Sequence, residues 1–223
     1  MTFSIVARCV RTGQFGVAIS SSSPAVAARC AHVRAGAGAV ASQNITDPAL
    51  GPLILDQLAA GLAAPQALGA ITTGRAHIDY RQLLVIDRAG QTAIHSGGQV
   101  LGLWGEARGT DCAAGGNLLA RDTIPATMVA AFEAATGPLA ERLMQALEAG
   151  LAAGGEAGPV RSAGLKVADR LSWPLVDLRI DWADDPIGML RTAWDIYAPQ
   201  MAAYVQRAED PTQAPSYGVP GDE

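Results

Sequence analysis

Strand-like and helix-like segments occur in groups along this chain, and this order limits the fold more than any other feature. A hairpin turning near Gly13 and a strand of small residues at 38–42 come first, followed by two helix-like segments. A second hairpin turning at 87–90 and a strand near 111–115 then precede another helix pair, two strands and a last helix. Parallel βαβ folds need strict alternation, so the grouping favours two stacked antiparallel sheets with helices on both outer faces. We predict an α+β fold, a four-layer αββα sandwich.

The first strand starts almost at the beginning of the chain. Apolar and polar residues alternate from Thr2 to Arg8, and the alternation resumes from Phe15 to Ile19. This period of two is typical of a half-buried hairpin. A strand that starts at position 2 leaves no room for a leader, so we expect the N-terminal residues to belong to the fold.

Four of the helices are predicted in two pairs. Asp47 and Pro48 form a helix start, with Leu53, Ile54 and Leu58 expected on its buried face, and Pro65 starts a second helix that ends at Gly74. The second pair is predicted from apolar residues repeating every four positions, namely Ile124, Met128 and Phe132, then Leu139, Leu143, Leu147 and Leu151. With no linker or repeat, we predict one domain, residues 1–207, and a Pro-rich C-terminal tail, residues 208–223.

Charge and cysteine content exclude several classes of protein. The 223 residues carry a net charge of −5, and Lys166 is the single lysine, so no basic stripe is present for nucleic acid. The longest uncharged run, 57–74, contains Pro65 and three glycines, which argues against a membrane span. Three widely spaced cysteines fit a reducing cytoplasm. We expect a cytoplasmic protein that binds neither nucleic acid nor membrane.

Motifs for metals and cofactors are weak. The three histidines, His32, His77 and His95, lack ligand spacing, and no paired CxxC occurs, so no metal is predicted. Residues 36–41 match G-x-G-x-x-A, with Asp56 twenty positions after Gly36. A dinucleotide site needs those glycines between a strand and a helix, whereas a strand-like segment continues through them. We therefore expect no cofactor.

Thr2 carries the clearest chemical hypothesis. An N-terminal threonine hydroxyl can attack an amide carbonyl when its own α-amine accepts the proton, because that amine has a pKa near 8. The mechanism requires removal of Met1, which aminopeptidases commonly perform before a small residue. Many proteins carry a small residue at position 2 for no catalytic reason, but here the first strand also begins at Thr2.

The chain resembles domain-of-unknown-function family 1028, within the N-terminal nucleophile (Ntn) hydrolase superfamily, and its order of elements is similar to that of a proteasome β-subunit. The resemblance lies in TFSIVAR at 2–8, TGQFGVA at 12–18, RAGAGAVASQ at 34–43, GNLLA at 116–120 and YGVPGDE at 217–223. It implies the same αββα sandwich and places Thr2 where the Ntn nucleophile lies.

The resemblance also implies a set of site residues. Ser20 and Ser21 fall where related enzymes place an aspartate, and Arg34 falls near their active-site lysine. Gly115, Gly116 and Asn117 resemble the Gly-rich loop at the oxyanion site, and Ser162 begins a turn similar to their late Ser-Gly-Gly turn. This set, with Thr2, Gly116 and Asn117 as catalytic groups and Ser20, Ser21, Arg34 and Ser162 as substrate-binding groups, is the predicted site.

One departure limits the mechanism. Arginine cannot act as a general base, so the α-amine of Thr2 is left as the base, and Arg34 would instead pair with a substrate carboxylate or be a surface residue. We therefore predict an Ntn-type amide hydrolase acting on a small, anionic C–N substrate. The alternative is a non-catalytic binding or scaffolding protein with the same sandwich. Either protein is expected to form a homodimer or larger homo-oligomer.

Overall fold

The computed structural model describes residues 2–219 and contains two antiparallel sheets. The six-stranded sheet has the order β10-β9-β2-β1-β8-β7, and the four-stranded sheet has the order β3-β4-β5-β6. The strands are β1 (Thr2–Arg8), β2 (Phe15–Ser21), β3 (Ala31–Arg34), β4 (Gly38–Asn44), β5 (Arg81–Asp87), β6 (Thr92–Ser96), β7 (Gly105–Gly109), β8 (Cys112–Asn117), β9 (Ser162–Ala168) and β10 (Val176–Ile180). The predicted first hairpin is therefore β1 and β2, and the second is β5 and β6.

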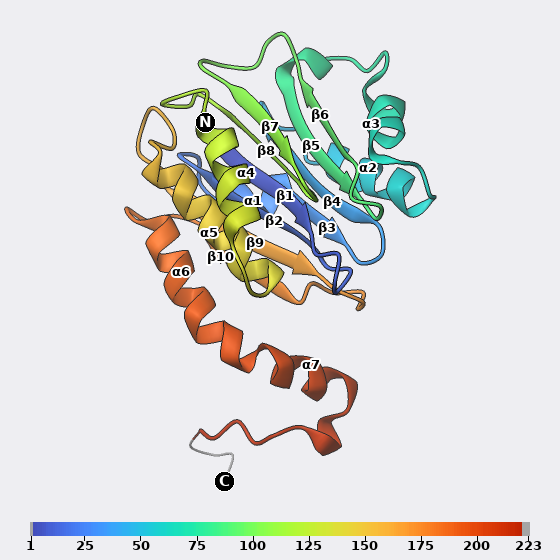
Figure 1. Cartoon of the computed structure of the whole chain (residues 1–223), viewed down its shortest axis with the longest axis vertical. Coiled ribbons are helices and arrows are strands. Elements are labelled where there is room, and N and C mark those ends of the chain that lie inside the picture. Colours follow the sequence, from blue (N-terminus) through green and yellow to red (C-terminus); the bar gives the residue numbers. More distant parts are fainter. Residues whose placement is uncertain (1, 220–223) are drawn as a thin grey trace.

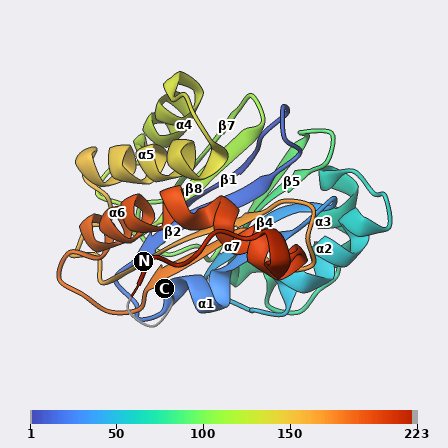
Figure 2. The ribbon, with the colours of Figure 1, turned by 90° about the horizontal axis from the view of Figure 1, so that it is seen from below.

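Helices cover the outer face of each sheet (Figures 1 and 2). The six-stranded sheet is covered by α4 (Ile124–Ala134), α5 (Leu139–Ala152) and α6 (Pro186–Tyr197), and the four-stranded sheet by α2 (Leu50–Ala59) and α3 (Ala64–Thr72). The two sheets face each other, with β1 against β4 and β8 against β5. This arrangement confirms the predicted four-layer αββα sandwich.

Strand β1 shows how the alternation separates the layers. Phe3 and Ile5 point into the core under α4, α5 and α6, while Val6 points into the core between the sheets. Both faces of a central strand are thereby buried, which explains why the sequence from Thr2 to Ala7 is free of charge. A third core lies between the four-stranded sheet and α2 with α3.

Four elements differ from the sequence-based expectation. The Ala-rich segment after the serines forms α1 (Val26–Cys30) and β3, and the Gly-rich segment before residue 111 contains β7, all of which the sequence left unassigned. The helix expected from Pro48 begins at Leu50. Leu53, expected on its buried face, is 37% exposed, because Leu50, Ile54 and Leu58 define the face that packs on the sheet.

The C-terminal segment leaves the body of the molecule (Figure 1). Asp185 caps α6 by accepting the N–H of Gly188 at 3.0 Å, as the Asp-Pro pair predicts. A helix, α7 (Met201–Glu209), follows, so the expected boundary at residue 207 falls inside a helix. Residues 220–223 of the predicted tail lie outside the described residues. Within residues 2–219, none of the helices has both the length and the apolar character that crossing a membrane requires.

Candidate functional site

Four polar residues form one row across the six-stranded sheet, at the end where β1 begins. Asn117 of β8 is the register partner of Thr2, and Ser21 of β2 is the partner of Ser162 in β9. The Thr2 hydroxyl donates a long hydrogen bond of 3.4 Å to Ser21 Oγ, which joins the two pairs. Neighbouring strands in register place such side chains on one face. Four of the seven predicted site residues therefore meet between the two sheets.

The serines of this row hold the start of the following loop. Ser21 Oγ accepts the N–H of Ser23 at 3.0 Å, and Ser162 Oγ donates to the Ser23 carbonyl at 2.6 Å. Ser162 Oγ also accepts the N–H of Val26 at 3.2 Å. Because each hydroxyl contacts backbone, both serines fix the wall next to Thr2 as well as contributing polar atoms.

Glu156 is the residue of this region that the sequence did not predict. It precedes β9, it is 4% exposed, and both carboxylate oxygens accept the N–H of Ser22, at 3.0 and 3.1 Å. Burial raises the pKa of Glu156 to about 7, although the Ser22 N–H opposes the shift. Since Ser22 follows Ser21 directly, the chain places a carboxyl group that titrates near neutral pH beside the row.

A buried amide network closes the site from the opposite sheet. Ser4 Oγ donates to Gln43 Oε1 at 2.6 Å, and Gln43 Nε2 donates to Gln82 Oε1 at 2.8 Å. Gln82 Oε1 also accepts Asn117 Nδ2 at 3.2 Å. Asn117 Oδ1 is buried and has no hydrogen-bond partner among residues 2–219. A buried acceptor without a hydrogen bond lowers the stability of the folded protein unless a ligand or another donor binds it.

The glutamines were also missed, although the sequence carries a signal for them. Gln43 continues the face of β4 on which Ala39 and Ala41 point into the inter-sheet core, and Gln82 occupies the equivalent position in β5 before Leu84. A glutamine at an inward position of a strand must find a buried partner. For Glu156 no such signal exists, because it lies in a loop without periodicity.

Three predicted site residues lie apart from the row. The side chain of Ser20 points to the opposite, helix-covered face, where its hydroxyl donates to the Ser162 carbonyl at 2.9 Å. Gly116 is paired with both Phe3 and Gly105, so its backbone belongs to a strand and not to the expected Gly-rich loop. Arg34 lies at the end of β3 and pairs with Asp56 at 2.8 Å.

Arg34 is therefore distant from Thr2. It lines a cavity together with Lys166, which is four residues along β9 from Ser162. At about 3.3 Å per residue, four residues of strand span about 13 Å. The structure does not bring Arg34 to the predicted site.

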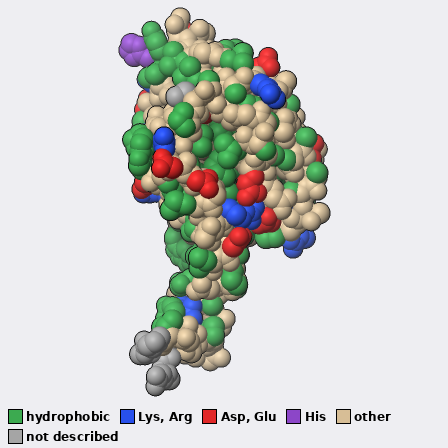
Figure 3. All heavy atoms as spheres, turned by 90° about the vertical axis from the view of Figure 1, so that its left-hand side faces the viewer, with side chains coloured by type: hydrophobic (Ala, Val, Ile, Leu, Met, Phe, Trp, Pro, Cys, Tyr) green, Lys and Arg blue, Asp and Glu red, His purple; other side chains and the backbone are tan. Residues whose placement is uncertain are grey.

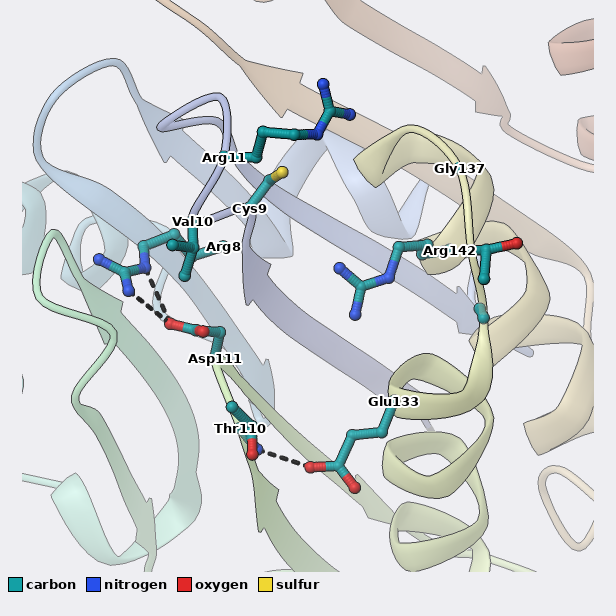
Figure 4. A pocket seen from close by; sticks show the side chains of 11 residues that line it. Arg8, Cys9, Val10, Arg11, Thr110, Asp111, Glu133, Gly137 and Arg142 are labelled. Atoms are coloured by element: carbon teal, nitrogen blue, oxygen red, sulfur yellow. Dashed lines mark hydrogen bonds and ion pairs between the residues drawn. The ribbon is translucent and has the colours of Figure 1, made fainter.

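A cavity of about 560 Å³ lies at the other end of β1 (Figure 4). Arg8 and Asp111 point toward each other there and form an ion pair of 2.7 Å, while Glu133 accepts the N–H of Thr110 at 2.7 Å. Arg142 points into the cavity from α5. Since Arg8, Asp111 and Glu133 already contact one another or the backbone, these side chains hold the β1–β2 turn, β8 and α4 together.

Metal ligands do not converge in the part of the chain that the structure describes. Within residues 2–219, no group of three or more histidine, cysteine, aspartate or glutamate side chains is placed to hold a metal ion. The polar groups of the row are hydroxyls, amides and one carboxyl group, which suit hydrogen bonding and proton transfer.

The sequence of the chain matches a known protein family. Its sequence matches the family of unknown function DUF1028 over residues 2–190, which is most of the chain. The chain belongs to the DUF1028 family. A solved DUF1028 structure, protein SPO2555 from Silicibacter pomeroyi, is similar to this chain at 30% sequence identity and a TM-score of 0.82, covering 88% of this chain and 89% of that one.

Two further comparisons say less about this DUF1028 protein. Anbu, an ancestral β-subunit from Yersinia bercovieri, aligns at 12% identity and a TM-score of 0.40, over 91% of this chain and 97% of that one. A TM-score of 0.40 is too low to define a common fold. No curated protein matches the sequence.

Proposed function

We propose that this DUF1028 protein is an amide hydrolase of the Ntn type, with Thr2 as nucleophile once Met1 is removed. The observation that carries the proposal is the row of Asn117, Thr2, Ser21 and Ser162, with Glu156 beside it. In the proposed reaction, the Thr2 hydroxyl attacks the carbonyl carbon, and its proton passes by way of the α-amine to the leaving amine. Water then hydrolyses the acyl-threonine ester.

Two buried acceptors suit a free α-amine at Thr2. Asn117, the register partner of Thr2, has an Oδ1 atom without a hydrogen-bond partner among the described residues. Glu156 is a buried carboxyl group that accepts the N–H of Ser22, the residue after Ser21. An ammonium group donates hydrogen bonds to both kinds of oxygen. An ionised Glu156 would favour the ammonium form of the α-amine, whereas the protonated Glu156 that burial favours leaves the amine free to act as the base.

The amide network gives the proposed site a source of hydrogen-bond donors. Asn117 Nδ2 is oriented by Gln82, whose own Nε2 is held by the Gly116 carbonyl at 3.2 Å. A side-chain amide held in place stabilises a developing oxyanion without reorganisation. In this proposal Asn117 serves as that donor, and Gln82 positions it.

Labelling of the threonine tests the proposal without knowledge of the substrate. The chain is prepared with Thr2 as its first residue, by release from an N-terminal fusion, and is treated with a β-lactone that acylates nucleophilic threonines. We expect one acyl group on Thr2, located by peptide mass spectrometry. Thr2→Ala and the protein that retains Met1 are expected to remain unlabelled, whereas Thr127→Ala, a change on the exposed surface of α4, is expected to label normally. Equal labelling of Thr2→Ala would refute the proposal.

A second candidate function is favoured by the burial of the nucleophile. Thr2 is 5% exposed, and its hydroxyl is hydrogen-bonded to Ser21. A non-catalytic member would keep this row as structure and bind its ligand elsewhere. The labelling experiment separates the two, because a structural threonine stays unlabelled even when it is the first residue.

A further inference from the structure

The cavity beside Arg34 is cationic in an acidic protein. It measures about 470 Å³, and its wall includes Arg34, Lys166 and Arg170 but no acidic side chain. The chain carries a net charge of −5, and Lys166 is its single lysine. Three cations around one cavity therefore oppose the overall charge and favour an anionic occupant.

The cavity lies where the smaller sheet ends and the larger one continues. Arg34 belongs to β3, the edge strand of the four-stranded sheet, whereas Lys166 belongs to β9 of the six-stranded sheet. Arg170 lies in the loop that joins β9 to β10. Because rigid strands position two of these cations, their separation is set by the sheets.

Two of the three cations, Arg34 and Lys166, each form one ion pair with a carboxylate. Arg34 Nη1 lies 2.8 Å from Asp56, and Lys166 Nζ lies 3.1 Å from Asp177. These contacts use one donor of Arg34 and one of the three donors of Lys166. The remaining donors have no partner among residues 2–219 in either case.

Arg170 shows which ligand geometry the cavity accepts. Its two terminal nitrogens contact both carboxylate oxygens of Glu209, with Nη1 to Oε1 at 2.5 Å. Glu209 is the last residue of α7, so this fork-to-fork pair ties the C-terminal helix to the rim of the cavity. Planar bidentate pairing of this kind is specific for carboxylates and similar oxyanions.

Apart from Ser172, the rest of the wall is apolar. Val33, Leu171 and Trp173 line the cavity, and the Trp173 ring is 36% exposed. An indole face with free surface binds flat apolar groups well. The cavity thus combines carboxylate-binding cations with a surface for a planar body.

We propose that this cavity is a binding site for a small carboxylate with a flat apolar body, separate from the Thr2 row, and that Glu209 competes with the ligand for Arg170. The ligand carboxylate lies among Lys166, the free donors of Arg34 and the fork of Arg170, and its body lies against Trp173. Binding draws Arg170 away from Glu209 and so loosens α7. The site does not depend on the chemistry proposed for Thr2.

Calorimetric titration of the full chain at low salt tests the site, with 2-naphthoate as the probe and neutral 2-naphthamide as its control. We expect the acid to bind one to one and at least about tenfold more tightly than the amide, as charged hydrogen bonds require. Arg34→Gln and Lys166→Gln are each expected to weaken binding by about fivefold or more. Glu209→Gln is expected to strengthen it by about threefold or more, because the Arg170 fork is freed.

Matched controls keep the result decisive. Arg179→Gln removes an exposed arginine of β10 that pairs with Asp181 outside the cavity, and it should leave affinity unchanged. Thr2→Ala should also bind normally, so failure of the hydrolase proposal leaves this one standing. Circular dichroism verifies that each variant is folded. If Lys166→Gln is unfolded, the affinities of Arg34→Gln and Glu209→Gln still test the proposed site. Equal affinity for acid and amide, or an unchanged affinity in Glu209→Gln, would overturn the proposal.

Discussion

Glu156 is a carboxyl group in a buried position that disfavours its charged form. Both of its oxygens share the same backbone N–H of Ser22, and almost none of its surface meets water. Burial outweighs the positive charge of the N terminus and the hydrogen bonds from Ser22, so the pKa of Glu156 is raised and the protonated form is favoured up to neutral pH. Thr2 could be predicted because the first strand begins there, and Ser21, Ser162 and Asn117 were predicted from the family resemblance. Glu156 could not, because its burial depends on Ser22, which is 134 residues away.

Because of Glu156, the free energy of unfolding should decrease as pH rises. The pKa of Glu156 rises from 4.5 to about 7 on folding, so between these values the folded state holds a proton that the unfolded state has lost. The contribution of Glu156 protonation to the free energy of unfolding is complete below about pH 4.5 and is lost as pH rises through about 7. This contribution amounts to at most about 3 kcal/mol. Urea unfolding should show the wild type losing stability from pH 5 to 8 relative to Glu156→Gln. Parallel profiles for the two proteins would contradict this assignment, and Asp122→Asn, a change of an exposed carboxylate, serves as control.

The three cysteines should react at different rates. Burial alone would raise the pKa of the Cys9 thiol, but hydrogen bonds from Thr12 and Arg11 and the charge of Arg11 outweigh it and lower that pKa. Burial raises the pKa of Cys30, and it raises that of Cys112 to about 12. Because the thiolate is the reactive form, brief treatment with iodoacetamide should modify Cys9 first. Peptide mass spectrometry measures this order, and modification of Cys112 before Cys9 would be inconsistent with it.

At the scale of elements, close contact between strands depends on small residues. Gly38 starts β4, and a Cβ atom built there would lie 2.2 Å from the Ile86 carbonyl oxygen of β5. The long hairpins and regular helices could be predicted because their periodicity is strong. Strands β3 and β7 could not, since β3 has only four residues and β7 is an edge strand with two glycines. Their positions depend on neighbouring strands more than on their own residues.

Two glycine substitutions should have opposite effects. Gly38→Ala places a methyl group against fixed backbone and against Leu58, so we expect it to lower the free energy of unfolding by about 1 to 3 kcal/mol. Gly69→Ala lies within α3 with open space around its Cβ position, so it should raise that free energy by about 0.5 to 1 kcal/mol. Urea denaturation of both variants measures the difference. Equal changes of the same sign in the free energy of unfolding would show that the residues around Gly38 move to accommodate the methyl group.

The C-terminal segment of the described chain is little buried, and α7 contains no buried residue. On α6, Ile196 is 62% exposed and Met189 is also exposed, and Tyr217 and Val219 are exposed near the C terminus. Figure 3 shows hydrophobic side chains gathered where this segment leaves the body. Apolar surface of this kind on a protruding segment favours contact with another protein chain. We propose that it packs against a second copy of this chain to form a homodimer, the smaller of the assemblies expected from the sequence, which were a homodimer or a larger homo-oligomer.

Light scattering tests the dimer. Full-length protein at micromolar concentration should have twice the mass of one chain, and protein that lacks residues 201–223 should have the mass of one chain, because the segment supplies the contact. Circular dichroism verifies that the shortened protein is folded. Two monomeric samples would exclude the dimer, and two dimeric samples would place the interface elsewhere.

The central position of β1 also sets an order of events during synthesis. Its neighbours are β2, which follows at once, and β8, which begins at Cys112. Strands β9 and β10 extend the six-stranded sheet beyond β2, and they are complete only when the chain has been made up to Ile180. At about 5 to 20 residues per second, the roughly 100 residues from the end of β2 to the end of β8 leave one edge of the strand that carries Thr2 open for about 5 to 20 seconds. Any enzyme that trims the N terminus has that interval in which to act, before the ribosome has supplied the strands that bury Thr2.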